Sequence, residues 1–154
     1  TFGTPFMKTL ALDAVARLGQ TRVAIVETRR AWGAMLETGI PTFWEEFPDT
    51  GDFRSMYGRP FGRSLCHGWA AGPAALLPRH VLGLRPTAPG WREFTLEPHL
   101  QGLDWAAAVV PVSTGPIAVT TWSDGRLVAS VPEGMPLVLP NGQRCGAGRF
   151  AGLI

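Results

Sequence analysis

The chain has 154 residues, of which 45% are hydrophobic, and its formal net charge is +2. This composition suffices for one domain or two small ones and argues against wholesale disorder. The basic residues are scattered, so the sequence lacks the dense basic patch expected of a protein that binds nucleic acid or an anionic membrane. No apolar run reaches the roughly 18 residues that a membrane span requires.

Two cysteines, Cys66 and Cys145, have neither CxxC spacing nor a metal-ligand pattern. Two free thiols are favoured over a single disulfide, which fits a reducing compartment and favours a cytoplasmic location. No metal or organic cofactor is indicated. The first residues, Thr1 to Phe6, include no initiator Met and do not resemble a signal peptide, so we expect a piece of a longer protein.

Two helices are predicted before residue 40. Thr4 can cap the first, over residues 5–18, because Pro5 suits the first helical position and Gly19 ends the run. The second covers about 22–37, and the short link between the two predicts a helical hairpin. The side chains expected to face inward are Phe6, Leu10, Val15, Leu18, Val23, Val26, Trp32, Met35 and Leu36.

A long connection without periodicity follows over residues 40–63, and loops of this length are usually functional or disordered. Its aromatic residues argue against disorder. A third helix is expected over about 64–80, with Ser64 as its cap. Gly68, Gly72 and Pro73 lower its helical propensity, so it is expected to kink or to start late.

The pattern changes near residue 90, where short β-type runs alternate with turn residues. The turn Ser123-Asp124-Gly125 predicts a β-hairpin. Helices followed by strands indicate an α part and a separate β-sandwich, with a boundary near 85–90. The predicted strands lie within 92–97, 106–112, 116–122, 126–131 and 137–139.

Two segments carry residues suited to sugar chemistry. Residues 41–47 set a carboxylate beside a Trp, and residues 64–73 set a His and a Trp at the expected start of the third helix. Glycosidases use a carboxylate to move a proton, and aromatic faces can hold a sugar ring. Only one well-placed carboxylate is found, whereas glycoside hydrolysis needs two.

These segments resemble the C-terminal end of bacterial α-L-rhamnosidases (glycoside hydrolase family 78). The resemblance implies an α+β fragment: residues 1–87 as the last helices of an (α/α)6 barrel, and residues 88–154 as a small antiparallel β-sandwich. Its order and spacing make it specific. The matching pieces include Gly3-Thr4-Pro5, Thr42-Phe43-Trp44-Glu45, Cys66-His67-Gly68-Trp69, Leu82-Gly83-Leu84-Arg85-Pro86, Pro89-Gly90-Trp91 and Leu103-Asp104-Trp105.

The resemblance assigns Glu45 as the general base of an inverting mechanism. The general acid belongs to an earlier segment of the family's chain, which nothing here matches, so the isolated chain is expected to be inactive. His67 and Trp44 are candidates to hold the sugar, and Glu46 either binds a sugar hydroxyl or faces solvent. The implied partners are a rhamnose-containing glycoside and the remainder of the barrel, with no nucleic acid and no membrane.

Alternative readings remain open. Trp69 is either core or a wall behind the site, and an adjacent Cys66–His67 nucleophile pair is disfavoured because neighbours on a helix point about 100° apart. Two alternatives to a rhamnosidase also stay open for the whole chain. It is a non-catalytic carbohydrate-binding or packing module, or it is part of a related (α/α)6 glycosidase acting on another sugar. Further candidates, weighed against solvated-loop or core roles, are Asp49, Asp52, Arg54, Tyr57, Arg59, Trp91, Trp105 and Trp122.

Overall fold

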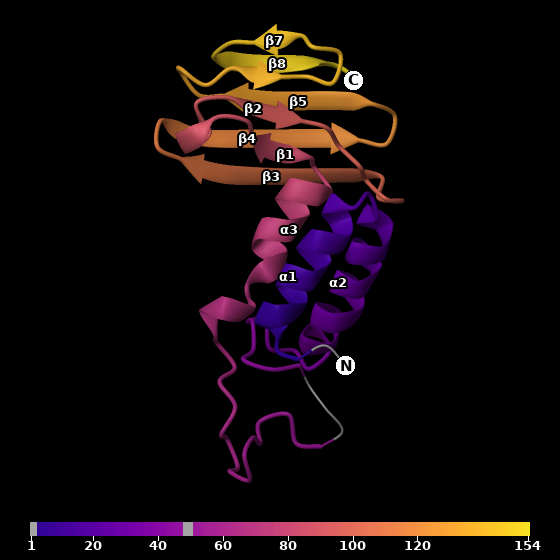
Figure 1. Cartoon of the computed structure of the whole chain (residues 1–154), viewed down its shortest axis with the longest axis vertical. Coiled ribbons are helices and arrows are strands. Elements are labelled where there is room, and N and C mark those ends of the chain that lie inside the picture. The colour runs from indigo at the N-terminus through magenta and orange to yellow at the C-terminus, as the bar shows by residue number, and fades with distance from the viewer. Residues whose placement is uncertain (1–2, 48–50) are drawn as a thin grey trace. The chain divides into compact units, whose positions relative to one another are not determined.

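A computed structural model describes residues 3–47 and 51–154. The chain divides into two compact units, Thr1–Leu76 and Leu77–Ile154, called here the helical unit and the β unit (Figure 1). The domain assignment 1–87 and 88–154 stays a prediction. Asp49 lies outside the described residues. In the described part of the chain, no helix is long and apolar enough to span a membrane.

The helical unit begins with a hairpin of two helices, as predicted. Helix α1 covers Pro5–Arg17 and helix α2 covers Thr21–Leu36, and the two pack side by side (Figure 1). The hydroxyl of Thr4 accepts a hydrogen bond from the backbone N–H of Met7 (3.5 Å), so Thr4 is the N-cap that the sequence indicates. The three residues between the helices, 18–20, reverse the direction of the chain.

The prediction of the buried faces was wrong for much of the hairpin. Helix α1 buries Lys8, Leu12 and Ala16, while Phe6 and Leu10 on the face expected to be inward are exposed. In α2 the inward positions Trp32 and Met35 are confirmed, but three others are not. The exposed large apolar side chains of the two helices and their ends are Phe6, Met7, Leu10, Leu18, Val23, Val26 and Leu36.

A charged cluster fastens the two helices together. The ammonium of Lys8, almost fully buried, lies 2.9 Å from Glu27 Oε2, and Arg30 donates to the same carboxylate from the next turn of α2. Hydrogen bonds from Arg30 and from Lys8 lower the pKa of Glu27 from the ordinary 4.5 to about 2. The carboxylate therefore stays ionised well into the acid range.

The third helix is shorter than the sequence predicted. A 3-10 turn, η1 (Gly68–Ala70), precedes helix α3 (Gly72–His80), and residues 64–67 are not helical. Ser64 is therefore not a helix cap. Gly72, at the start of α3, closely approaches α1: a Cβ there would lie 1.8 Å from Thr9 Oγ1. The indole N–H of Trp32 also donates to the carbonyl of Ala70 (2.8 Å) and fixes the turn.

The β unit contains two four-stranded sheets. One has the order β1-β2-β6-β7 and the other β3-β4-β5-β8, and all pairs are antiparallel except β2 with β6 (Figure 1). The elements are β1 (Leu84–Pro86), η2 (Pro89–Trp91), β2 (Phe94–Leu96), β3 (Trp105–Val112), β4 (Gly115–Trp122), β5 (Arg126–Val131), β6 (Leu137–Val138), β7 (Arg144–Cys145) and β8 (Gly148–Leu153).

Both sheets contribute to one apolar core. Phe94 and Leu96 from β2 join Ile117, Leu127 and Leu137 in a single buried cluster. The inward residues of β4 and β5 alternate with more exposed ones, as a sheet with one covered face requires. The antiparallel β4–β5 pair confirms the hairpin predicted at Ser123-Asp124-Gly125. This arrangement is consistent with the β-sandwich predicted after the helices.

Candidate active site

The two segments singled out in the sequence lie against each other in the helical unit. The N–H of Glu45 donates to the carbonyl of Ser64 (2.9 Å), and the N–H of His67 donates to the carbonyl of Phe43 (2.7 Å). The hydroxyl of Thr42 also donates to the carbonyl of Leu65. These bonds pair the segments in opposite directions, so residues about 20 positions apart in sequence are neighbours in space.

Glu45 is held at both its backbone and its side chain. Its Oε2 accepts a hydrogen bond from the backbone N–H of Ser64 (3.2 Å), and its carbonyl accepts one from the indole N–H of Trp69 (3.3 Å). The residue is half-buried. The backbone N–H of Ser64, from the opposite segment, therefore orients the Glu45 carboxylate.

Glu46 has a different environment. Its carboxylate lies 4.0 Å from Arg63 Nη2, and the Arg63 side chain is only 2% exposed. Arg63 Nη1 also donates to the carbonyl of Phe53 (2.8 Å). The Glu46 carboxylate is therefore next to a buried guanidinium that anchors the loop, whereas the Glu45 carboxylate accepts a hydrogen bond from a backbone N–H. The two adjacent carboxylates, which the sequence could not tell apart on chemistry alone, differ clearly in what they touch.

Trp44 is fully buried. Its ring stacks on Phe53, with centroids 5.0 Å apart, and joins the cluster formed with Trp32 and Met35. Its indole N–H is buried without an acceptor among residues 3–47 and 51–154. Trp44 therefore has no solvent-facing surface in this structure.

An exposed aromatic cluster lies beside Glu45. The ring of His67 is 4.7 Å from that of Trp69, and Trp69 stacks on Phe6 of α1 at 6.2 Å with an interplanar angle of 21°. Trp69 is 45% exposed. The sequence placed Phe6 in the core and left Trp69 undecided, so it missed this cluster. The only shared signal in the sequence is that each aromatic residue lies in the first turn of its helix, Phe6 in α1 and Trp69 in η1.

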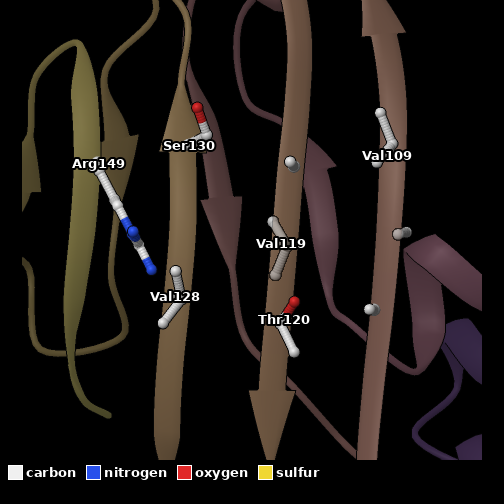
Figure 2. A pocket seen from close by; sticks show the side chains of 9 residues that line it. Val109, Val119, Thr120, Val128, Ser130 and Arg149 are labelled. Atoms are coloured by element: carbon white, nitrogen blue, oxygen red, sulfur yellow. The ribbon is translucent and has the colours of Figure 1, made fainter.

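A second candidate lies on the β unit, on the face of β3, β4 and β5 that points away from the core. Trp105 and Trp122 are direct cross-strand partners, and the guanidinium of Arg126 lies 5.0 Å from the Trp122 ring centroid. Further along this sheet is an open hollow of about 430 Å³ (Figure 2). Figure 2 shows Arg149 extending from β8 towards Val128 on β5 at one side of it.

The remaining chemistry-bearing groups in the described part of the chain are not assembled into a centre. Both cysteines are free, and Cys66 is exposed. Within residues 3–47 and 51–154, no group of three or more His, Cys, Asp or Glu side chains has the arrangement of a metal site. Tyr57 and Arg59 are exposed in the loop between the two paired segments. In the same loop, the carboxylate of Asp52 pairs with the guanidinium of Arg54 at 3.8 Å.

Comparison with known proteins identifies relatives of both units. Residues 83–146 match the family model of the bacterial alpha-L-rhamnosidase C-terminal domain. A family 78 rhamnosidase from Bacillus sp. GL1 is 33% identical, with a TM-score of 0.71 over 91% of this chain. A comparison with curated proteins finds no match.

Two further solved structures show the same fold at lower identity. The α-L-rhamnosidase of Aspergillus terreus is 22% identical with a TM-score of 0.73 over 96% of this chain, and that of Streptomyces avermitilis, complexed with L-rhamnose, is 18% identical with a TM-score of 0.71 over 95%. This chain covers only 15%, 19% and 16% of the Bacillus, Aspergillus and Streptomyces chains. The chain is therefore homologous to the C-terminal domain of the α-L-rhamnosidases of glycoside hydrolase family 78.

Proposed function

We propose that this chain is the C-terminal portion of an inverting α-L-rhamnosidase, which removes terminal α-L-rhamnose from glycosides. In this proposal the chain supplies the general base, Glu45, and the rest of a longer parent protein supplies the general acid. The observation that carries the proposal is the pairing of residues 42–45 with 64–67, which holds Glu45 beside His67 and Trp69.

The proposed chemistry is a single displacement. Glu45 takes a proton from water as the water oxygen bonds to the anomeric carbon of rhamnose, and the bond from that carbon to the leaving oxygen breaks. An acid elsewhere in the parent protonates the leaving oxygen, so the configuration at the anomeric carbon inverts. The two carboxyl groups of such a pair stand about 6.5–9.5 Å apart, which leaves room for the water.

The geometry supports distinct roles for the other site residues. His67 is half-buried next to an exposed Trp69 face, a combination suited to bonding sugar hydroxyls and covering an apolar sugar face. Trp44, fully buried next to Glu45 in the sequence, would act as a positioning residue. Glu46, paired with the buried Arg63, would stabilise the loop and would contact the sugar only through its remaining exposed surface.

The helical unit is proposed to be the last part of an (α/α)6 barrel. Its hairpin leaves seven large apolar side chains exposed and buries Lys8 and Thr28. Apolar patches of this kind usually mark surfaces covered by other protein.

The test is hydrolysis of p-nitrophenyl α-L-rhamnoside by the full-length parent protein, comparing Glu45→Gln with Glu46→Gln. A positioned base typically contributes about 10²–10⁴-fold, so Glu45→Gln is expected to lose that factor in kcat. Glu46→Gln is the matched control, and it should lose far less. Near wild-type turnover by Glu45→Gln would remove this residue from the chemistry. The 154-residue chain by itself should show no turnover.

A second candidate function is carbohydrate binding by the β unit. The paired Trp105 and Trp122 on an uncovered sheet face favour it, because aromatic surfaces hold sugar rings. Retention of the protein on a rhamnose-containing polysaccharide, lost in Trp105→Ala, would support this role. A panel of nitrophenyl glycosides given to the parent protein distinguishes rhamnosidase from a related glycosidase acting on another sugar.

A further inference from the structure

The loop between the two paired segments has a defined, hydrogen-bonded conformation. Within residues 52–63, here called the aromatic loop, the N–H groups of Met56 and Arg59 each donate to the carbonyl of the other, at 3.2 and 3.0 Å. The two residues between them, Tyr57 and Gly58, both have positive φ angles, of 54° and 72°. This is the geometry of a tight hairpin turn, in which glycine or asparagine normally occupies both positions.

The base of the aromatic loop is firmly attached to the helical unit. The buried Arg63 donates its backbone N–H to the carbonyl of Arg54 (3.1 Å) and its guanidinium to that of Phe53 (2.8 Å). Met56 is buried as well. A Cβ at Gly62 would lie 2.5 Å from the carbonyl oxygen of Met56, so the chain crosses itself closely there. These contacts define one conformation for the loop.

Two bulky residues occupy unfavourable backbone conformations in this loop and gain little burial in return. Tyr57 and Phe61 have φ angles of 54° and 64°, a region where aromatic residues are outliers. Their side chains are 81% and 77% exposed. Glycine would satisfy the backbone better at both positions. An outlier that the local packing does not compensate is characteristic of a residue retained for a contact with a ligand.

We propose that Tyr57 and Phe61 bind the aglycone of the rhamnoside, specifically an aromatic ring attached to, or close to, the leaving oxygen. This inference rests on the proposed function of Glu45. The rings offer exposed apolar faces for stacking, and the exposed Arg59 between them in sequence adds donors for phenolic oxygens.

The position of the loop in the chain fits an aglycone contact. Ser64, whose N–H binds the Glu45 carboxylate, is three residues after Phe61, so their Cα atoms are within about 11 Å. In an inverting site the leaving group lies across the sugar from the base, and acid and base stand about 6.5–9.5 Å apart. The aromatic loop is therefore long enough to extend from the base side to the leaving-group side.

The experiment compares two substrates in the full-length protein: p-nitrophenyl α-L-rhamnoside, with an aromatic aglycone, and methyl α-L-rhamnoside, without one. The variant is Tyr57→Gly/Phe61→Gly, which removes both rings and relieves both backbone conformations, so it should fold. Tyr57→Phe with Phe61 unchanged is the control that keeps both rings. Stability is followed in parallel by the Tm of each protein.

The double glycine variant should lose about 4- to 100-fold in kcat/KM for the p-nitrophenyl substrate, mainly through KM, if each ring contributes about 2- to 10-fold. Its kcat/KM for the methyl substrate and its Tm should not fall, and Tyr57→Phe should match the wild type on both substrates. Equal losses on both substrates, no loss on either, or a lowered Tm would overturn the aglycone contact while leaving Glu45 as base. Wild-type protein that cleaves neither substrate would instead overturn the proposed function, and the aglycone contact with it.

Discussion

The helical unit and the β unit differ in which kinds of side chain they bury. In the β unit, residues from both sheets, such as Phe94, Ile117 and Leu137, meet in a fully buried cluster. In the helical unit, large apolar residues such as Leu10 and Val26 are exposed, while charged and polar groups are buried between the helices. The β unit has the core of an independent domain, whereas the helical unit exposes large apolar side chains, as expected under the proposal that further polypeptide covers them.

The largest effect is expected when the two units are produced separately, which tests whether each one folds alone. Residues 77–154 expressed alone should fold and unfold cooperatively on heating, because their core is complete. Residues 1–76 alone should associate or fail to give a cooperative transition. Circular dichroism melts and dispersion of amide NMR signals measure both. A cooperative, monomeric helical unit would contradict the account of an incomplete surface.

A matched pair of phenylalanines gives the next largest effect. Phe94→Ala removes a fully buried ring from the β unit and should cost about 3–5 kcal/mol of unfolding free energy. Phe6→Ala removes a ring that is 43% exposed and should cost less than about 1 kcal/mol in the 154-residue chain. Hydrogen exchange of amides in each unit reports the two values separately. Similar costs would show that the exposed face of α1 is packed in solution.

A charged residue on the exposed face of α1 tests whether that face is covered in the proposed parent protein. Leu10→Lys should leave the stability of the 154-residue chain within about 0.5 kcal/mol, because the side chain is half exposed. In the full-length protein it should cost about 1–3 kcal/mol, because the residue becomes covered. Leu10→Met, which stays apolar, is the control in both proteins. Equal effects in the two would argue against a covering partner.

The smallest expected effect concerns the charged cluster between α1 and α2. The pKa of Glu27 is lower in the folded protein, about 2, than in the unfolded chain, so the folded state binds fewer protons between pH 4.5 and 2. Its contribution is complete above about pH 4.5 and declines as the pH falls towards 2. Acid titration of helicity should show a weaker pH dependence in Glu27→Gln. The control is Glu37→Gln, which removes an exposed carboxylate just after α2.

Much of the secondary structure could be predicted because its signals are local. Thr4 and Pro5 define the start of α1, and Ser123-Asp124-Gly125 defines the β4–β5 hairpin. The strand β8 was missed because Gly148 and Gly152 interrupt its apolar pattern. The third helix was placed too early because the backbone groups of residues 64–67 pair with residues 42–45, a non-local choice that no local pattern reveals.

The candidate site was only partly predictable, for a related reason. Glu45 and His67 were named from residue type and resemblance, and the structure does bring their segments together. Whether each aromatic residue is buried depends on contacts between segments far apart in sequence, which no local pattern reveals. Trp44 is in the core, and Phe6, expected inside, stacks with the exposed Trp69.

The most direct test of the central claim is azide rescue of Glu45→Gln in the full-length protein with p-nitrophenyl α-L-rhamnoside. If Glu45 activates water, azide, which needs no deprotonation, should restore p-nitrophenol release and yield a rhamnosyl azide of inverted configuration. The same variant without azide should stay nearly inactive. Full activity of Glu45→Gln, or inactivity that azide does not relieve, would contradict the assignment of Glu45 as the general base.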